Sequence, residues 1–315
     1  MTTFLAPAAR VFVAGHRGLA GSAIASELAD AGYEVVTRTR DELDLRDAAR
    51  TLDFLRDARP DAVVLAAATV GGIMANHRNP VPFLEDNLRI QLSVIAGAHA
   101  ADVNRLLFLG SSCIYPRLSP QPIPEEALGT GPLEPTNEAY ALAKIAGITQ
   151  IRSYRRQFGR AYIAAMPTNL YGPRDSFDQE TSHVLPALIR RLDDARREGR
   201  EEVVLWGTGT PRREFLHSAD LARACLLLLR DYDGETALNV GCGTDVTIAE
   251  LAATIAEAVG FTGRIGWDPS RPDGTPRKLL DVTRLRKLGF APRVELARGI
   301  RETYAWWVHE STGRQ

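Results

Sequence analysis

Short apolar runs alternate with amphipathic stretches along the first half of the chain. The β-prone apolar runs occupy residues 10–14, 33–37, 62–68, 105–110 and 161–165. Between them, residues 22–31 and 83–101 repeat apolar side chains with the period of a helix. Continuous apolar strands that alternate with helices predict a parallel sheet covered on both faces. We therefore expect an α/β fold of the doubly wound Rossmann type.

The composition changes near residue 172, where a polar loop leads into a basic helix. A later apolar run, residues 237–241, should return to the first sheet. These features predict two parts: a dinucleotide-binding Rossmann domain over residues 1–171, joined by segments near 215–245, and a smaller C-terminal α/β substrate domain over residues 172–315.

Three glycines, Gly15, Gly18 and Gly21, stand between the first predicted strand and the first predicted helix. Glycines in this context let backbone N–H groups approach a pyrophosphate, and the helix N-terminus adds partial positive charge. The pattern favours a dinucleotide site. The alternative is a glycine-rich turn that binds nothing.

The end of the second predicted strand carries arginines. An NAD site usually has an acidic residue here, which binds the ribose 2′-hydroxyl. This chain has Arg38 and Arg40 instead, and a guanidinium suits a 2′-phosphate. We therefore predict NADP(H) as the cofactor. The alternative is a pair of surface arginines, with Asp41 neutralising Arg40.

Composition narrows the possible partners. The chain is 45% hydrophobic and 24% charged with a net charge of -1, so no overall field attracts nucleic acid or an anionic membrane. Three widely spaced cysteines without a CxxC pair predict neither a disulfide framework nor a metal site, and fit a reducing cytoplasm. Residues 1–7 lack a basic region, so we expect no signal peptide.

Tyr140 and Lys144 are four residues apart on a predicted helix that begins after Pro135. This spacing places both side chains on one face. We expect the ammonium to lower the pKa of the phenol, so that Tyr140 can exchange a proton with a carbonyl oxygen near neutral pH. The alternative is a chance pair on a solvated helix.

Three further residues are candidate catalytic residues. Ser111 and Cys113 follow the strand at 105–110, and ligands of doubly wound sheets bind beyond the carboxyl ends of the strands. A serine hydroxyl there could bond a substrate carbonyl. The alternatives are a strand cap for Ser111 and a small buried hydrophobe for Cys113. His183, a single histidine in a loop, could equally be solvated.

With these residues placed, the chain resembles the extended short-chain dehydrogenase/reductases that act on nucleotide sugars. Within them it is similar to the GDP-L-fucose synthase family. The likeness runs from about residue 10 to the C-terminus. It rests on segments 13–18, 70–73, 109–116, 134–138, 182–184 and 273–278.

The resemblance implies a bifunctional NADPH-dependent 3,5-epimerase and 4-reductase that converts GDP-4-keto-6-deoxy-D-mannose to GDP-L-fucose. It assigns Cys113 as the base and His183 as the acid of the inversions. Tyr140 then protonates the C4 oxyanion, Lys144 holds the nicotinamide ribose and tunes Tyr140, and Ser111 orients the ketone oxygen.

The resemblance also implies binding residues and a homodimer. For NADP(H) these are Gly15, His16, Arg17, Gly18, Leu19, Ala20, Gly21, Arg40, Asp41, Leu109, Gly110, Ser111, Ser112, Lys144, Pro167, Thr168, Asn169, Leu170 and His183. For the GDP-sugar they are Arg191, Trp206, Arg213 and Asp273. The alternatives are a solvated charge for Arg191 and a core side chain for Trp206.

Two other functions compete with this interpretation. A close relative could make another GDP-deoxyhexose, such as GDP-colitose, from a substrate without the C3 hydroxyl. A non-catalytic NADP-binding protein could share the fold, but it would be expected to lack the tyrosine, lysine, cysteine or histidine.

Overall fold

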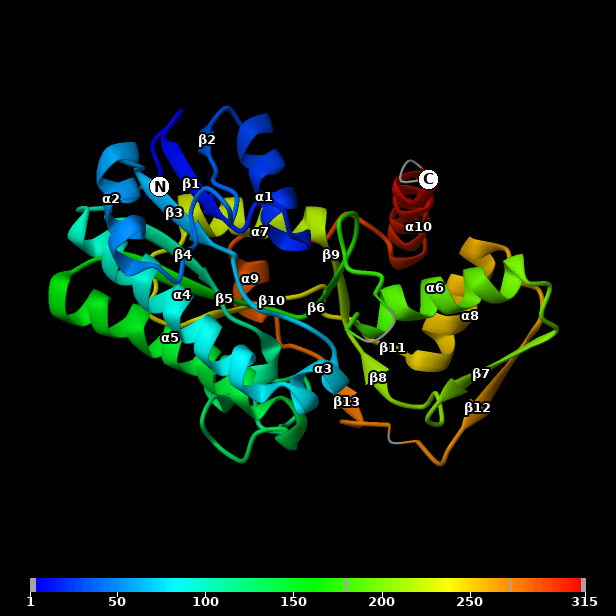
Figure 1. Ribbon diagram of the computed structural model, residues 1–315. Helices are drawn as coiled ribbons and strands as arrows, with labels where there is room; N and C mark the ends of the chain where they lie inside the picture. Colours follow the sequence, from blue (N-terminus) through cyan, green and yellow to red (C-terminus); the bar gives the residue numbers. More distant parts are fainter. Residues whose placement is uncertain (1–3, 179–180, 272, 313–315) are drawn as a thin grey trace.

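A six-stranded parallel sheet forms the centre of the larger part of the molecule (Figure 1). The computed structural model describes residues 4–178, 181–271 and 273–312. The strand order is β10-β5-β4-β3-β1-β2, so the sheet is doubly wound as predicted. The strands are β1 (Arg10–Ala14), β2 (Glu34–Val36), β3 (Ala62–Leu65), β4 (Arg105–Leu109), β5 (Ala161–Pro167) and β10 (Leu238–Val240).

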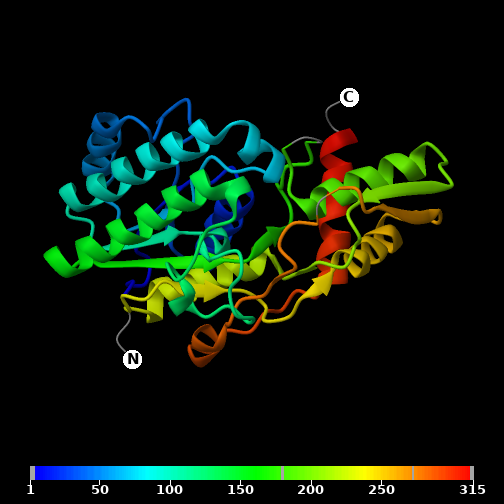
Figure 2. The same cartoon turned by 90° about the horizontal axis from the view of Figure 1, so that it is seen from below.

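Helices cover both faces of this sheet (Figure 2). Alternate residues of each strand point to opposite faces, so Phe12 and Val63 belong to one apolar core and Val11 and Val64 to the other. The first core is covered by α2 (Ala48–Ala58), α4 (Pro80–Ala100) and α5 (Glu138–Phe158). The second is covered by α1 (Leu19–Asp30), α7 (Ser218–Asp231) and α9 (Thr283–Lys287).

The smaller part has its own apolar core, built from three helices and a pair of strands. These are α6 (Val184–Arg197), α8 (Ile248–Val259), α10 (Leu296–Thr312), β7 (Glu202–Trp206) and β12 (Arg264–Asp268). Short strands lie between this core and the sheet: β6 (Asn169–Tyr171), β8 (Arg212–Arg213), β9 (Phe215–His217), β11 (Val246–Thr247) and β13 (Arg277–Lys278). No helix in the described ranges is both long and apolar enough to cross a bilayer.

Several element boundaries differ from the sequence-based expectation. Helix α1 begins at Leu19 rather than at residue 22, directly after the glycine turn. The segment at 71–74, expected to be a loop, ends in the short helix α3 (Ile73–Arg78). Tyr140 lies on a new helix as expected, and this helix begins at Glu138, directly after the 3₁₀ turn Pro135–Asn137 and without a side-chain cap.

A glycine lets α5 pack closely on the sheet and on α4. A Cβ at Gly147 would lie 2.5 Å from the Phe108 ring and 2.8 Å from the Gln91 side chain. We predict that Gly147→Ala lowers the free energy of unfolding, because overpacking costs about 1–3 kcal/mol and exceeds the roughly 1 kcal/mol gained in helix propensity. Denaturant titration measures this.

The matched control is Ala146→Ser, at an exposed position on the same helix. It should change the free energy of unfolding by less than about 0.5 kcal/mol. A Gly147→Ala protein as stable as the wild type would contradict the packing argument.

Candidate active site

One cavity of about 1490 Å³ joins the carboxyl ends of the sheet strands to residues of the smaller part. The loops after β1, β2, β3, β4 and β5 all reach its wall. Because the strands are parallel, these loops converge at one edge of the sheet. The cavity therefore gathers groups that are far apart in the sequence.

The glycine turn after β1 forms one end of the cavity. Gly15 has a positive φ of 92°, and a Cβ there would lie 2.7 Å from the Ala67 backbone. A Cβ at Gly21 would lie 2.1 Å from the Gly15 carbonyl oxygen. Helix α1 begins here without a side-chain cap, and Nδ1 of His16 is buried with no hydrogen-bond partner in the described part of the chain. This turn fits a pyrophosphate.

Arg40 lines the cavity beyond the end of β2 and is exposed. Within the described ranges, no carboxylate forms an ion pair with its guanidinium, so the alternative in which Asp41 neutralises it does not occur. Asp41 itself is exposed and does not line the cavity, which argues against its place in the cofactor set. The other predicted cofactor residues all line the cavity.

Lys144 lies beneath the floor of the site. Its ammonium donates to the Leu109 carbonyl at 2.8 Å and lies 5.7 Å from the centre of the Tyr140 ring. Burial lowers the pKa of Lys144 to about 8. The i, i+4 spacing therefore brings the two side chains together, although the described structure has Lys144 bonded to the strand end rather than to the phenol.

The expectation that Lys144 lowers the pKa of Tyr140 is wrong. Burial raises the pKa of the phenol, and the negative charge of Cys113 adds to the rise, while the Ser111 hydroxyl opposes it. The phenol is half-buried, and the Phe83 ring packs against it edge to face at 6.5 Å. Tyr140 therefore keeps its proton at neutral pH, the form that a proton donor requires.

Ser111 and Cys113 lie where β4 ends. The Ser111 Oγ accepts the Cys113 backbone N–H at 3.2 Å and begins a 3₁₀ turn, so the strand-cap alternative also holds. Cys113 is half-buried, and its Sγ accepts from the Lys278 ammonium at 3.4 Å. Burial would raise the pKa of the thiol, but the charge of Lys278 and the bond from Ser111 lower it overall. Cys113 is not an inert core cysteine.

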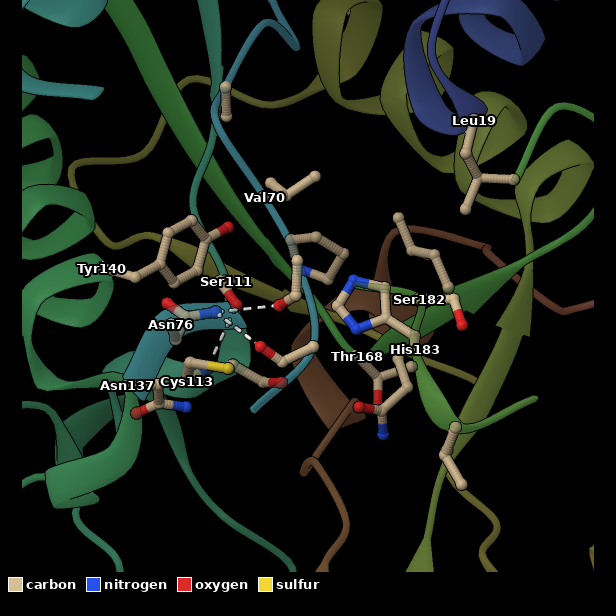
Figure 3. A pocket seen from close by; sticks show the side chains of 18 of the residues that line it. Leu19, Val70, Asn76, Ser111, Cys113, Asn137, Tyr140, Thr168, Ser182 and His183 are labelled. Atoms are coloured by element: carbon tan, nitrogen blue, oxygen red, sulfur yellow. Dashed lines mark hydrogen bonds between the residues drawn. The ribbon is translucent and has the colours of Figure 1, made fainter. Parts of the chain in front are cut away.

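His183 reaches the same space from the smaller part. It precedes α6, and its ring stands across the pocket from Tyr140; Ser111 lies beside Tyr140 and Cys113 below it (Figure 3). Partial desolvation at the cavity wall lowers the pKa of the imidazole, and the charge of Lys278 lowers it further. His183 is exposed and lines the cavity, so its ring is open to solvent, as in the alternative, and also borders the site.

The segment before His183 is held against the larger part. The Gly72 N–H donates to the Thr181 carbonyl at 2.7 Å, and a Cβ at Gly72 would lie 2.6 Å from the Ser182 carbonyl oxygen. The Asn76 amide fixes this glycine segment by donating to the carbonyls of Gly71 and Gly72 (Figure 3). These contacts set the distance of His183 from the sheet.

The predicted GDP-sugar residues all line the cavity. Asp273 accepts from the Thr208 backbone and hydroxyl at 2.7 and 2.8 Å, and so fixes the loop after β7. Burial lowers the pKa of Arg213, which the Asp273 charge opposes, and burial likewise lowers the pKa of Arg191. Arg213 is half-buried, whereas Arg191 is exposed, as its solvated alternative expects. Both line the cavity, where an anionic diphosphate would compensate their charge.

Trp206 is not a core residue. Its side chain is 55% exposed and lines the cavity, with the Arg271 guanidinium 5.2 Å from the centre of its ring. The core alternative for this residue is wrong. An exposed indole beside a basic pocket offers a flat surface for a purine base or a sugar ring.

Sequence reasoning missed two residues of the site. The sequence assigns no role to Lys278, in the 273–278 segment, yet its ammonium contacts Cys113. It also gives no reason to single out Asn76, which lies on α3 just beyond the expected loop at 71–74. The available signal for Lys278 was composition, since lysine is rare among the 38 basic residues of this chain.

Comparisons with known proteins agree with this geometry. Residues 11–241 match the NAD dependent epimerase/dehydratase family. The chain is 54% identical to GDP-L-fucose synthase 1 of Arabidopsis thaliana, over 97% of this chain and 95% of the relative. It is 52% identical to the GDP-L-fucose synthase of Escherichia coli (strain K12), over 95% and 96%.

Among solved structures, a GDP-L-fucose synthetase from Naegleria fowleri bound to NADP matches with a TM-score of 0.90 at 28% identity, over 99% of this chain and 98% of that one. These matches confirm the resemblance inferred from the motifs. The chain therefore belongs to the NAD dependent epimerase/dehydratase family and, within it, to the GDP-L-fucose synthase family.

Proposed function

We propose that this chain is a bifunctional NADPH-dependent 3,5-epimerase and 4-reductase that converts GDP-4-keto-6-deoxy-D-mannose to GDP-L-fucose. One observation carries the proposal: Ser111, Cys113, Tyr140 and His183 border the same space in one cavity (Figure 3). A plain reductase would need the serine and tyrosine but neither the thiol nor the imidazole. The printed names of the relatives support the same reaction.

Inversion at a carbon beside the ketone requires a base on one face of the sugar and an acid on the other. The thiolate of Cys113 takes the proton from C3 or C5, and the electron pair moves onto the C4 oxygen as an enolate. The hydroxyls of Ser111 and Tyr140 stabilise that oxygen by hydrogen bonds. The imidazolium of His183 then returns a proton to the carbon from the opposite face.

The reduction uses the same oxygen-binding groups. NADPH supplies a hydride for C4 when it is bound. Tyr140 gives its proton to the resulting oxyanion, and its raised pKa keeps that proton in place until the negative charge develops. Ser111 orients the ketone, and Lys144 can replace the lost proton from beneath, since its pKa of about 8 lies near neutrality.

The fit of the cavity to NADP(H) rests on three segments. The glycine turn after β1 can receive the pyrophosphate, and Arg40, after the neighbouring strand β2, can receive the 2′-phosphate. Pro167–Leu170, at and after the end of β5, would line the nicotinamide. We accordingly assign cofactor binding to residues 1–171 and GDP-sugar binding mainly to residues 172–315.

We also propose a cytoplasmic homodimer. The thiols of Cys113, Cys225 and Cys242 are free, which fits a reducing compartment. Leu92 on α4 is 54% exposed and Leu142 on α5 is 47% exposed. Because these helices pack side by side, their outer faces could meet those of a second copy (Figure 2).

The proposed function is tested by NADPH oxidation after addition of GDP-4-keto-6-deoxy-D-mannose. We expect turnover with wild-type protein, and a loss of about a hundredfold or more in Tyr140→Phe, because the oxyanion then lacks its proton donor. Exchange of the C3 and C5 protons of the sugar with heavy water should persist in this variant, because Cys113 and His183 are unchanged.

GDP-mannose, which has no ketone, is the control substrate and should give no turnover. A protein that binds NADPH but never oxidises it would be a binding protein and not a reductase. Wild-type rates in Tyr140→Phe would remove the phenol from the mechanism. A strong preference for a substrate lacking the C3 hydroxyl would favour a GDP-colitose enzyme.

A second prediction concerns the base. Cys113→Ser should suppress deuterium uptake from heavy water at C3 and C5, because a serine hydroxyl is not ionised near neutral pH. NMR of the recovered sugar measures the labelling. The matched control is Cys242→Ser, whose thiol bonds Thr244 and does not line the cavity. Undiminished labelling in Cys113→Ser would mean that another group is the base.

A third prediction concerns cofactor choice. Arg40→Ala should weaken binding of NADPH by about tenfold to a hundredfold, the usual effect of one charged hydrogen bond, and leave NADH nearly unaffected. Fluorescence titration with both cofactors gives the two dissociation constants. Equal losses for NADPH and NADH would remove the 2′-phosphate role from Arg40.

A further inference from the structure

Lys278 is the nearest cation to the thiol that we assign as the base. Its Nζ lies 3.4 Å from Cys113 Sγ, and both side chains line the cavity. Lys278 is half-buried, and no carboxylate in the described part of the chain forms an ion pair with it. The charged or polar groups that face Cys113 are therefore Lys278, Arg213, the Ser111 hydroxyl and the Tyr140 phenol.

The backbone that carries Lys278 is fixed by buried hydrogen bonds. Strand β13 pairs with β8, and the Lys278 carbonyl accepts the Glu214 N–H at 3.3 Å. The next two residues are bonded as well, since Leu279 N–H donates to Gln121 Oε1 at 2.9 Å and Leu280 N–H donates to Glu214 Oε2 at 3.0 Å. The ammonium is thus held toward the thiol by the fold rather than placed by a flexible loop.

Composition gives an independent indication that an ammonium is needed here. Lys and Arg together number 38, and only three of these are lysines: Lys144, Lys278 and Lys287. Two of the three line the cavity, and Lys287 is exposed on α9. An ammonium is a compact point charge, whereas a guanidinium is a planar fork. In a chain that uses arginine for nearly every cation, the residue in contact with the thiol is a lysine.

We propose that Lys278 is a positioning residue that holds Cys113 as a thiolate, so that the base of the epimerisation is ready before substrate binds. The proton of the thiol is released to solvent, and the ammonium compensates the charge that remains on sulfur. This inference rests on the proposed function for the role of the thiolate, but the charge state itself belongs to the free protein.

Lys278 acts on the acid as well as on the base. Its charge contributes to the lowered pKa of Cys113 and, after burial, to the lowered pKa of His183. A lowered thiol pKa raises the thiolate fraction at a given pH, and a lowered imidazole pKa reduces the imidazolium fraction. Removing the charge should therefore move both limbs of the epimerisation pH profile to higher pH.

The direct test measures alkylation of Cys113 by iodoacetamide against pH, without substrate or NADPH. The thiolate attacks the methylene carbon and iodide leaves, so the rate follows the thiolate fraction. Mass spectrometry of the Cys113 peptide separates it from Cys225 and Cys242. We expect a wild-type midpoint below the ordinary thiol value of 9.0, and a rise of about one pH unit or more in Lys278→Met.

Two variants control this experiment. Lys287→Met removes the exposed lysine of α9 and should leave the midpoint unchanged. Lys278→Arg keeps a positive charge and should restore at least part of the lowered midpoint. Equal midpoints in Lys278→Arg and Lys278→Met, or a wild-type midpoint at the ordinary value, would overturn the proposal. If Lys278→Met fails to fold, a wild-type midpoint at the ordinary value would still overturn the proposal.

A second readout separates this role from a structural one and from the proposed function. Deuterium exchange at C3 and C5 by Lys278→Met should be lost near neutral pH and recover at alkaline pH, where the thiol ionises unaided. A distorted site would lose exchange at every pH. If Cys113 is alkylated with the expected pH dependence but the wild-type protein exchanges no protons at C3 or C5, the Lys278 inference stands and the proposed function fails.

Discussion

The carboxylate of Glu214 connects the segments on which the site depends. It is fully buried and accepts the backbone N–H groups of Gly243 at 2.6 Å and Leu280 at 3.0 Å. Its own backbone donates to the Lys278 carbonyl and accepts from the Asn169 side chain. Burial raises the pKa of this carboxyl, which the amide hydrogen bonds oppose. One residue thus connects the segment after β10, the segment after β5 and the strand that carries Lys278.

Burial and local charge then set different protonation states within one cavity. The phenol of Tyr140 is desolvated beside a negative sulfur, so it retains its proton. The thiol of Cys113 is also desolvated, but an ammonium lies in contact with it, so its pKa falls. In the proposed mechanism, the two groups serve as acid and base at the same pH. Their roles follow from neighbours rather than from residue type alone.

The sequence predicted the features that depend on residues close together in the chain. Apolar runs of strand length, the glycine turn and the spacing of Tyr140 and Lys144 identified the doubly wound sheet and one half of the site. The start of α1 and the existence of α3 were missed, because the glycine turn and the Gly72 contact with Thr181 are tertiary features.

The rest of the site could not be derived from spacing. Cys113 and Lys278 are 165 residues apart, and tertiary pairing brings them together: β13 pairs with β8, and Leu280 bridges to Ile123. Their roles, and that of His183, came from the resemblance or from the structure. The predicted fall in the pKa of Tyr140 was wrong because it also depended on tertiary structure. Burial raises this pKa, and the Lys144 ammonium is bonded to the Leu109 carbonyl instead of to the phenol.

The central claim is that Cys113 and His183 address opposite faces of one keto sugar held by Ser111 and Tyr140. A crystal structure of the Tyr140→Phe protein with GDP-4-keto-6-deoxy-D-mannose and NADP tests it most directly. We predict the Cys113 sulfur against one face of the sugar ring, the His183 ring against the other, and the ketone oxygen beside Ser111. A sugar with both side chains on the same face, or with His183 out of reach, would contradict the account.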